Sequence, residues 1–219
     1  IFRNAASYGG GVYLANSNNA TLRSNQIFSN TVGNDGGAVR LEDSTNATLV
    51  NNMMVENRIT TGIGAGVSVY SSTAHLLHTT LARNGGGGGR GVYATLTSTL
   101  WMTNTILVSH TVGIYVSGGS TATLEATLWG RDEWANGTDA MGSAIVTGTH
   151  NYTSRPNFVD YAAGDYHLSS TSAAIDSGVP VPAWLTDDID GDPRPFGGAP
   201  DLGADERTCF VRLNDTPYD

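Results

Sequence analysis

The sequence predicts an all-β fold, a right-handed parallel β-helix of about six coils with an irregular C-terminal cap rich in proline and aspartate. Two observations predict it: a degenerate repeat of 22 to 29 residues, and a composition with 28 glycines, no lysine and 14% charged residues. A solenoid coil of three short strands fits that repeat length, whereas helical repeats need about 33 residues or more. Long amphipathic helices are also disfavoured, because the residues that favour them are scarce or scattered.

Each repeat opens with a glycine-led strand, and successive openings lie 26, 29, 25 and 22 residues apart. The openings are Gly-Val-Tyr-Leu at 11–14, Gly-Ala-Val-Arg-Leu at 37–41, Gly-Val-Ser-Val at 66–69, Gly-Val-Tyr-Ala at 91–94 and Gly-Ile-Tyr-Val at 113–116. A second strand follows, such as Asn-Ala-Thr-Leu at 19–22, and then a short apolar pair such as Ile27 and Phe28. Apolar and polar residues alternate, so one face of each strand points into the coil and stacking must bury it.

Charge and proline content both divide the chain near residue 155. Residues 1–159 hold eight acidic residues and eight arginines, whereas residues 160–219 hold twelve acidic residues and three arginines. All seven prolines lie from Pro156 onward. We therefore expect coils over 1–155, beginning in mid-coil, a cap segment over 156–207 packed on the solenoid, and the start of a further module or a linker over 208–219.

Composition excludes several function classes. The formal net charge is −9, so no basic stripe is available to neutralise nucleic acid phosphates. No apolar run approaches the roughly 18 residues of a membrane span. Cys209 is the only cysteine, which rules out a disulfide within the chain and leaves either a free thiol or pairing with a cysteine outside it.

Asparagines recur in the turns at regular intervals. Asn30, Asn57 and Asn84 are separated by equal steps of 27 residues. A second set is expected from Asn25 and Asn52, which we match with Asn104. Stacked coils lie about 4.8 Å apart, so equivalent asparagine side chains can form a hydrogen-bonded ladder along the stack. We interpret both sets as structural.

Two parts of the sequence resemble known families. The coil region, residues 1 to about 150, resembles the parallel β-helix repeats of pectate-lyase-like proteins and of many bacterial surface proteins. The following segment contains Asn-Phe-Val-Asp at 157–160, Asp-Ile-Asp-Gly-Asp-Pro-Arg at 188–194 and Pro-Asp-Leu-Gly-Ala-Asp-Glu at 200–206. It resembles the end of β-helix proteins of the choice-of-anchor type, and this resemblance implies an exported bacterial protein, secreted or held at the cell surface.

One carboxylate cluster has spacing suitable for a metal ion. Asp188, Asp190 and Asp192 alternate in a predicted loop and could offer hard oxygen ligands to a structural Ca²⁺. Apart from this candidate, no cofactor is expected. The loop is not an EF-hand, because Pro193 stands where that motif needs glycine. A structural alternative is that Arg194 pairs with one of these aspartates and pins the cap.

Catalytic residues are not assigned, because the expected groups are missing from the coils. A polysaccharide lyase of this fold needs a basic residue beside a charge neutraliser, yet there is no lysine and Glu42, Asp43 and Glu56 are isolated in the sequence. Residues 66–124 contain no acidic residue, so a pair of glycosidase carboxylates has no place there. Of the five histidines, His75 and His78 point to opposite faces of a strand, which argues against a shared metal.

Tyrosines on equivalent strands are the remaining candidates. Tyr13, Tyr93 and Tyr115 occupy the same place in the Gly-x-Tyr pattern and could bind carbohydrate, or could simply stabilise packing between coils. The sequence thus predicts a non-enzymatic extracellular scaffold, an adhesive or filament-forming surface protein whose partners are copies of itself or adjacent β-helix modules. The alternative is a lyase-like or carbohydrate-binding β-helix protein acting on a surface polysaccharide.

Overall fold

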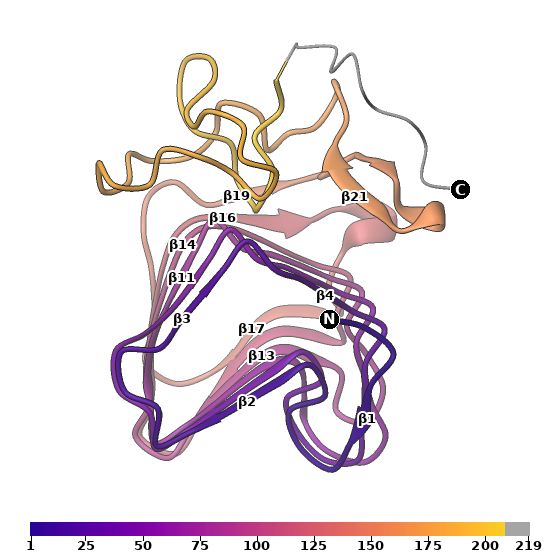
Figure 1. Cartoon of the computed structure of the whole chain (residues 1–219), viewed down its shortest axis with the longest axis vertical. Coiled ribbons are helices and arrows are strands. Elements are labelled where there is room, and N and C mark those ends of the chain that lie inside the picture. The colour runs from indigo at the N-terminus through magenta and orange to yellow at the C-terminus, as the bar shows by residue number, and fades with distance from the viewer. Residues whose placement is uncertain (209–219) are drawn as a thin grey trace.

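A computed structural model describes residues 1–208 and shows a parallel β-helix of about six coils. Figure 1 looks nearly along the solenoid axis, so successive coils overlie one another. The fold prediction is therefore confirmed. The predictions for Cys209 and for most of segment 208–219 fall outside the described residues.

Two large sheets form the coils. The six-stranded sheet contains β2 (Val12–Ala15), β6 (Val39–Glu42), β10 (Gly64–Tyr70), β13 (Arg90–Thr95), β15 (Val112–Val116) and β17 (Thr138–Gly142). The ten-stranded sheet contains β3 (Thr21–Arg23), β4 (Gln26–Phe28), β7 (Ala47–Val50), β8 (Met53–Val55), β11 (Thr73–Leu77), β12 (Thr80–Ala82), β14 (Thr99–Val108), β16 (Thr121–Gly130), β18 (Ile145–Thr147) and β19 (Tyr152–Ser154). All strand pairs within these two sheets are parallel.

Smaller elements complete the chain. A three-stranded sheet of β1 (Ala5–Ala6), β5 (Thr31–Val32) and β9 (Arg58–Ile59) forms a third side of the early coils. The short helices η1 (Asp132–Trp134) and η2 (Tyr161–Ala163) and the antiparallel pair β20 (Phe158–Asp160) and β21 (Asp165–Leu168) follow. Among the described residues no helix has the length and apolar character needed to cross a membrane.

The interior of the coils is a continuous apolar core. Leu41, Val69 and Ile114 are fully buried members, contributed by alternate positions of the six-stranded sheet. Intervening residues of the same strands point outward, as the strand period of two requires. Close stacking also demands glycine at some turns: a Cβ on Gly37 would lie 2.0 Å from the Ala65 carbonyl oxygen of the next coil.

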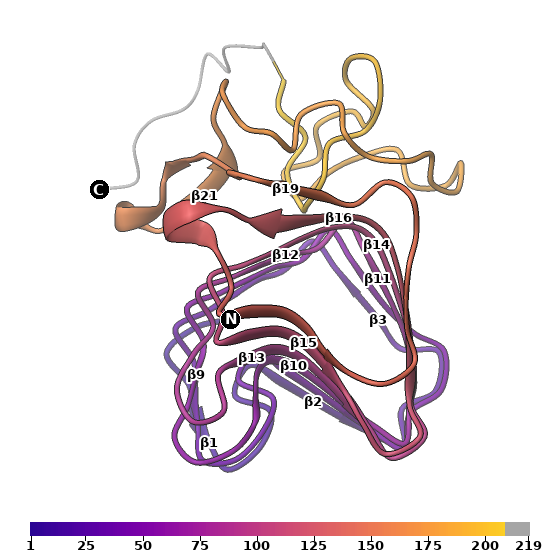
Figure 2. The ribbon, with the colours of Figure 1, turned by 180° about the vertical axis from the view of Figure 1, so that it is seen from behind.

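The cap segment, residues 156–207, lies along the side of the solenoid rather than over its end (Figures 1 and 2). A second apolar core forms there between the outer face of the ten-stranded sheet and the cap. It joins Val55, Ile106 and Leu128 of the sheet to Tyr166 and Leu202 of the cap. The cap thus returns to early coils: Asn51 donates to the Asp187 carbonyl at 2.7 Å, and Tyr166 donates to Glu56 at 2.8 Å.

Hydrogen-bonded ladders run along the turns. Asn30 donates to Asn57, and Asn57 to Asn84, at 2.9 and 3.0 Å between the side-chain nitrogen and oxygen atoms. Asn25 donates to Asn52 in the same way at 3.0 Å. The predicted match with Asn104 was wrong, because the strand register aligns Val50 with Leu77 and Leu77 with Thr103, which places Thr105 at the ladder position. Asn104 lies one residue earlier and donates instead to the Val179 carbonyl of the cap at 2.8 Å.

Candidate functional site

Outward side chains of the six-stranded sheet form what we call the tyrosine face, which carries Tyr13, Arg40, Tyr70, Arg90, Tyr93 and Tyr115. The register aligns Tyr13 with Arg40, Arg40 with Ser68, Ser68 with Tyr93, and Tyr93 with Tyr115. Four steps of about 4.8 Å make this row about 19 Å long. The face is an extended surface on a rigid sheet, and it gathers tyrosines from four coils and arginines from two.

Arg40 is the centre of one half of the tyrosine face. Its guanidinium carbon lies 4.1 Å from the ring centre of Tyr70 and 4.7 Å from that of Tyr8. Its Nε is 3.1 Å from Glu42 Oε2, and its Nη1 is 3.8 Å from Asp35 Oδ2. The sequence-based view of Glu42 as isolated was therefore wrong, since stacking brings residues of different coils against it. Arg40 is buried and already paired.

Hydrogen bonds set the ionisation of the groups around Arg40. The hydroxyl of Tyr13 donates to Glu42, which lowers the pKa of Glu42 and raises that of Tyr13. Burial, together with donation from its hydroxyl to Asp35 Oδ2 at 2.6 Å, raises the pKa of Tyr70. Burial is the largest single influence and disfavours the charged form of Arg40, but the hydrogen bond to Glu42, the charge of Glu42 and the contacts with Tyr70 and Tyr13 together outweigh it and raise the Arg40 pKa. The arrangement keeps Glu42 and Arg40 charged and both phenols neutral.

Arg90 dominates the other half of the tyrosine face. Its guanidinium carbon lies 4.2 Å from the ring centre of Tyr115 and 5.4 Å from that of Tyr93. Nε and Nη1 of Arg90 are shielded from solvent and have no hydrogen-bond partner within the described part of the chain. No carboxylate of residues 1–208 forms an ion pair with Arg90. The rings of Tyr93 and Tyr115 hold this guanidinium in place, and its charge has no partner of opposite sign within residues 1–208.

The three tyrosines predicted from the sequence occupy one row but not one cluster. The ring centres of Tyr93 and Tyr115 are 5.8 Å apart, whereas Tyr13 lies three strands from Tyr93, about 14 Å away. Sequence reasoning missed Arg90 and Asp35 as members of the site. Arg90 directly precedes the second Gly-x-Tyr strand, which was an available signal, whereas Asp35 lies in a turn whose position depends on the fold.

The predicted Ca²⁺ ligands have different roles from one another. Asp188 is 1% exposed, and its carboxylate accepts from the backbone nitrogens of Asp190, Asp192 and Glu206 at 2.8 to 2.9 Å. Its oxygens therefore shape the loop rather than stand free for an ion. Asp190 Oδ2 lies 2.9 Å from His167 Nε2 instead.

Arg194 does hold segments of the cap together, but its acidic partner is Glu206, which the sequence did not suggest. Its Nε is 3.4 Å from Glu206 Oε2, and its other nitrogens donate to the carbonyls of Gly203 and Ala204 at 3.1 and 2.9 Å. Burial lowers the pKa of Arg194 to about 10 and raises that of Glu206 to about 7. The proposed pairing of Arg194 with an aspartate of the 188–192 loop was therefore wrong.

A pocket of about 380 Å³ opens beside Arg194 in the cap, lined by Pro180, Pro182, Pro195 and Pro200 among others. Its walls are mostly apolar, and the nearby guanidinium is engaged by the cap backbone. The pocket is remote from the tyrosine face in sequence and offers few free polar groups. We therefore regard the tyrosine face as the better candidate site.

Comparison with known proteins supports the fold and goes no further. No family model and no curated protein matches the sequence. A solved structure titled "Crystal structure of pectate lyase Pel9A" is similar, with a TM-score of 0.54 at 15% sequence identity. The match covers 94% of this chain and 63% of that chain, so this chain spans less than two thirds of the neighbour's length. At this identity the likeness shows a shared parallel β-helix.

Proposed function

We propose that the chain is an extracellular carbohydrate-binding β-helix whose tyrosine face holds an extended acidic polysaccharide. The observation that carries this proposal is Arg90, a guanidinium that packs on the rings of Tyr93 and Tyr115 and forms no ion pair with any described residue. A carboxylate or sulfate ligand would supply the missing opposite charge and form charge-assisted hydrogen bonds with the accessible part of the guanidinium.

The aromatic rings suit a sugar polymer. Carbohydrate rings present apolar C–H faces that pack against aromatic rings, while their hydroxyl groups hydrogen-bond to polar side chains nearby. The tyrosine face supplies both kinds of group along about 19 Å of rigid sheet. The structural neighbour is, by its title, a pectate lyase, and that likeness also favours a saccharide ligand over a peptide.

Binding without cleavage fits the ionisation of the face better than lyase chemistry. A general base works best when its pKa is near the working pH. Arg40 is held charged by Glu42, and the raised pKa values of Tyr13 and Tyr70 keep both phenols protonated at neutral pH. The groups around Arg40 therefore position and recognise a ligand rather than remove a proton from it.

A second candidate role is stacking of modules end to end. Within residues 1–208, β2 and β3 are paired on one side only, and Val12, Leu14 and Leu22 of this first coil are only partly buried. Unpaired strand edges beside apolar side chains are templates for another coil. A preceding β-helix module or a second copy would cover this edge, and the surface would then serve as an adhesive scaffold in longer assemblies.

Affinity electrophoresis tests the binding proposal. Migration in native gels cast with polygalacturonate or alginate should be retarded, whereas gels containing a neutral glucan should leave it unchanged. Arg90→Gln should weaken binding about 10-fold or more, because a charge-assisted hydrogen bond contributes about 1.5–3 kcal/mol. Tyr115→Ala should weaken it severalfold.

Arg58→Gln is the matched control, since Arg58 is exposed on β9, away from the tyrosine face. It removes the same charge and should bind normally. Equal weakening by both arginine variants would mean that net charge alone governs retardation. Release of unsaturated uronates during incubation would refute binding without cleavage and would restore the lyase alternative.

A further inference from the structure

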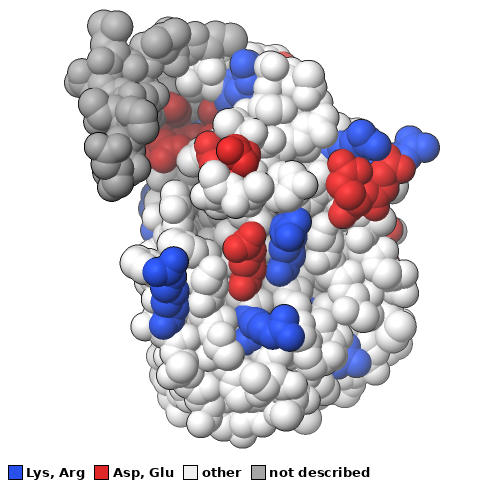
Figure 3. Space-filling model, turned by 90° about the vertical axis from the view of Figure 1, so that its right-hand side faces the viewer, with Lys and Arg blue, Asp and Glu red and all other residues white. Residues whose placement is uncertain are grey.

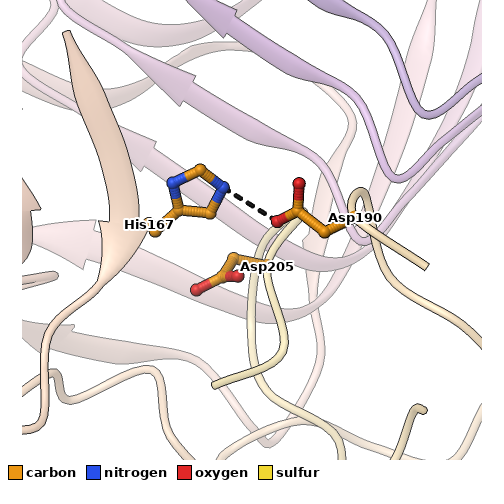
Figure 4. A group of neighbouring side chains, drawn as sticks. All are labelled: His167, Asp190 and Asp205. Carbon is orange, nitrogen blue, oxygen red and sulfur yellow. Dashed lines mark ion pairs between the residues drawn. The ribbon is translucent and has the colours of Figure 1, made fainter. Parts of the chain in front are cut away.

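Three side chains of the cap converge at a place that the tyrosine face does not involve. His167 comes from β21, Asp190 from the loop at 187–193, and Asp205 from the stretch that follows it (Figure 4). Their ligand atoms lie within 4.8 Å of one another. Segments separated by up to 38 residues thus meet through one nitrogen and two carboxylates.

The imidazole of His167 is oriented by a carboxylate behind it. Nδ1 of His167 is 2.6 Å from Asp165 Oδ1, and the backbone nitrogen of His167 donates to the same oxygen at 3.0 Å. Nε2 of His167 points toward Asp190 and forms an ion pair with it, at 2.9 Å from Oδ2. The contact with Asp190 is the main cause that raises the pKa of His167 to about 10, so a metal ion would bind here by displacing the Nε2 proton. Metal-binding histidines are commonly fixed in this way, by a carboxylate on the opposite ring nitrogen.

The cluster is partly shielded from solvent: Asp205 is buried, whereas the side chains of His167 and Asp190 are 32% and 35% exposed. Nε2 of His167 is buried and makes no hydrogen bond of acceptable geometry, although Asp190 Oδ2 lies at 2.9 Å. Asp205 is 7% exposed, and its Oδ2 is held by the backbone nitrogen of Leu168 at 2.7 Å.

We propose that His167, Asp190 and Asp205 bind a divalent transition-metal ion, Zn²⁺ being the best fit, and that the ion ties β21 to the two loops of the cap. One imidazole nitrogen with two carboxylate oxygens suits Zn²⁺, which takes few ligands, with water filling the remaining position. Ca²⁺ prefers six to eight oxygen ligands and gains little from imidazole. The site therefore differs in both residues and metal from the Ca²⁺ loop expected from Asp188, Asp190 and Asp192.

The role of such an ion would be structural. The ion would link three segments of the cap to one another. Because it would bind the folded cap and not the unfolded chain, it would stabilise the cap more as the ion concentration rises. The site shares no residue with the tyrosine face, so the proposal is independent of carbohydrate binding.

Calorimetric titration of the full chain with ZnCl₂ tests the proposal. All samples should carry Cys209→Ser, because a thiol is a competing zinc ligand. We expect one ion per chain, a melting temperature that rises with zinc concentration, and much weaker binding of Ca²⁺ and Mg²⁺. His167→Gln should abolish binding, and Asp165→Asn should weaken it about 10-fold to 100-fold through loss of orientation.

His150→Gln is the matched control, since His150 pairs with Glu125 on an exposed surface and should leave zinc binding unchanged. If His167→Gln does not fold, the milder Asp165→Asn and the visible spectrum of the Co²⁺-loaded chain report the site, with bands of nitrogen and oxygen ligation expected. No saturable zinc binding, stronger binding of Ca²⁺ than Zn²⁺, or full binding by Asp165→Asn and His167→Gln would each overturn the proposal.

Discussion

Replacing His110 with asparagine should make the protein less sensitive to acid. His110 occupies the position of the Asn30, Asn57 and Asn84 ladder in the next coil: Asn84 Nδ2 donates to His110 Nε2 at 3.3 Å, and His110 Nδ1 is 3.2 Å from Asn136 Oδ1. These contacts suit a neutral imidazole that carries its proton on Nδ1. A second proton on Nε2 would face the Asn84 amide donor.

Asn84 cannot turn to accommodate that proton without breaking the ladder. Its Oδ1 accepts from Asn57 at 3.0 Å, and its Nδ2 also donates to the Met54 carbonyl at 2.8 Å. Burial is the main cause that lowers the pKa of His110 from 6.5 to about 4. The unfolded chain therefore binds more protons than the native state between these values, so stability is full above pH 6.5 and falls as the pH drops toward 4.

The size of the effect follows from the shift. Lowering a pKa from 6.5 to about 4 corresponds to a loss of about 3 kcal/mol of unfolding free energy between pH 7 and pH 4. Asparagine does not titrate and can continue the ladder, so His110→Asn should lack this loss. The variant should be slightly less stable than wild type at pH 7, because the smaller side chain leaves space, and more stable at pH 4.

Urea unfolding at pH 4, 5, 6 and 7 gives the unfolding free energies of the variant and of the wild type. Taking their difference at each pH cancels the titration of the carboxylates that both proteins share. His150→Asn is the control, because it removes an exposed histidine. The difference for His110→Asn should change sign across the range. A difference that stays constant with pH would refute a buried neutral His110.

Two further predictions concern the stacking of coils. Asn57→Ala should lower the unfolding free energy by on the order of 3 kcal/mol, because it leaves several buried hydrogen-bonding groups without a partner. Asn18→Ala, in an exposed turn, should have little effect, and urea unfolding of both variants checks this. Gly37→Ala should lower the unfolding free energy by about 1–3 kcal/mol or more, because the added Cβ would meet the Ala65 carbonyl oxygen. A Cβ added at Gly85 would have no neighbouring atom within 4 Å, so Gly85→Ala should melt at the wild-type temperature. Equal melting temperatures for the two alanine variants would contradict the stacking distance.

Local patterns made the coils predictable. The Gly-x-Tyr openings and the 27-residue step of Asn30, Asn57 and Asn84 reflect contacts between neighbouring coils, which place like residues side by side. Repeats of unequal length were harder to align. Asn104 was misplaced by one residue for this reason, and a serine ladder passed unnoticed because its members are unevenly spaced. It comprises Ser17, Ser44, Ser72, Ser98 and Ser120.

The cap and the candidate sites depended on contacts that no local pattern encodes. Tyr166 meets Glu56 across 110 residues, and Thr80 meets Ala204 across 124. The Arg194 partner was misjudged because sequence proximity favoured the nearby aspartates over Glu206. On the face drawn in Figure 3, acidic and basic side chains cover only a small part of the surface. Composition gave no sign that Arg90 forms no ion pair within residues 1–208.

The most direct test of the central claim is calorimetric titration with a galacturonate oligosaccharide and with the same oligosaccharide after reduction of its carboxyl groups. Recognition by Arg90 predicts saturable binding of the acidic form, at least about 10-fold weaker binding of the reduced form, and loss of that preference in Arg90→Gln. Equal affinity for the two forms, or an unchanged preference in Arg90→Gln, would contradict the account of the tyrosine face.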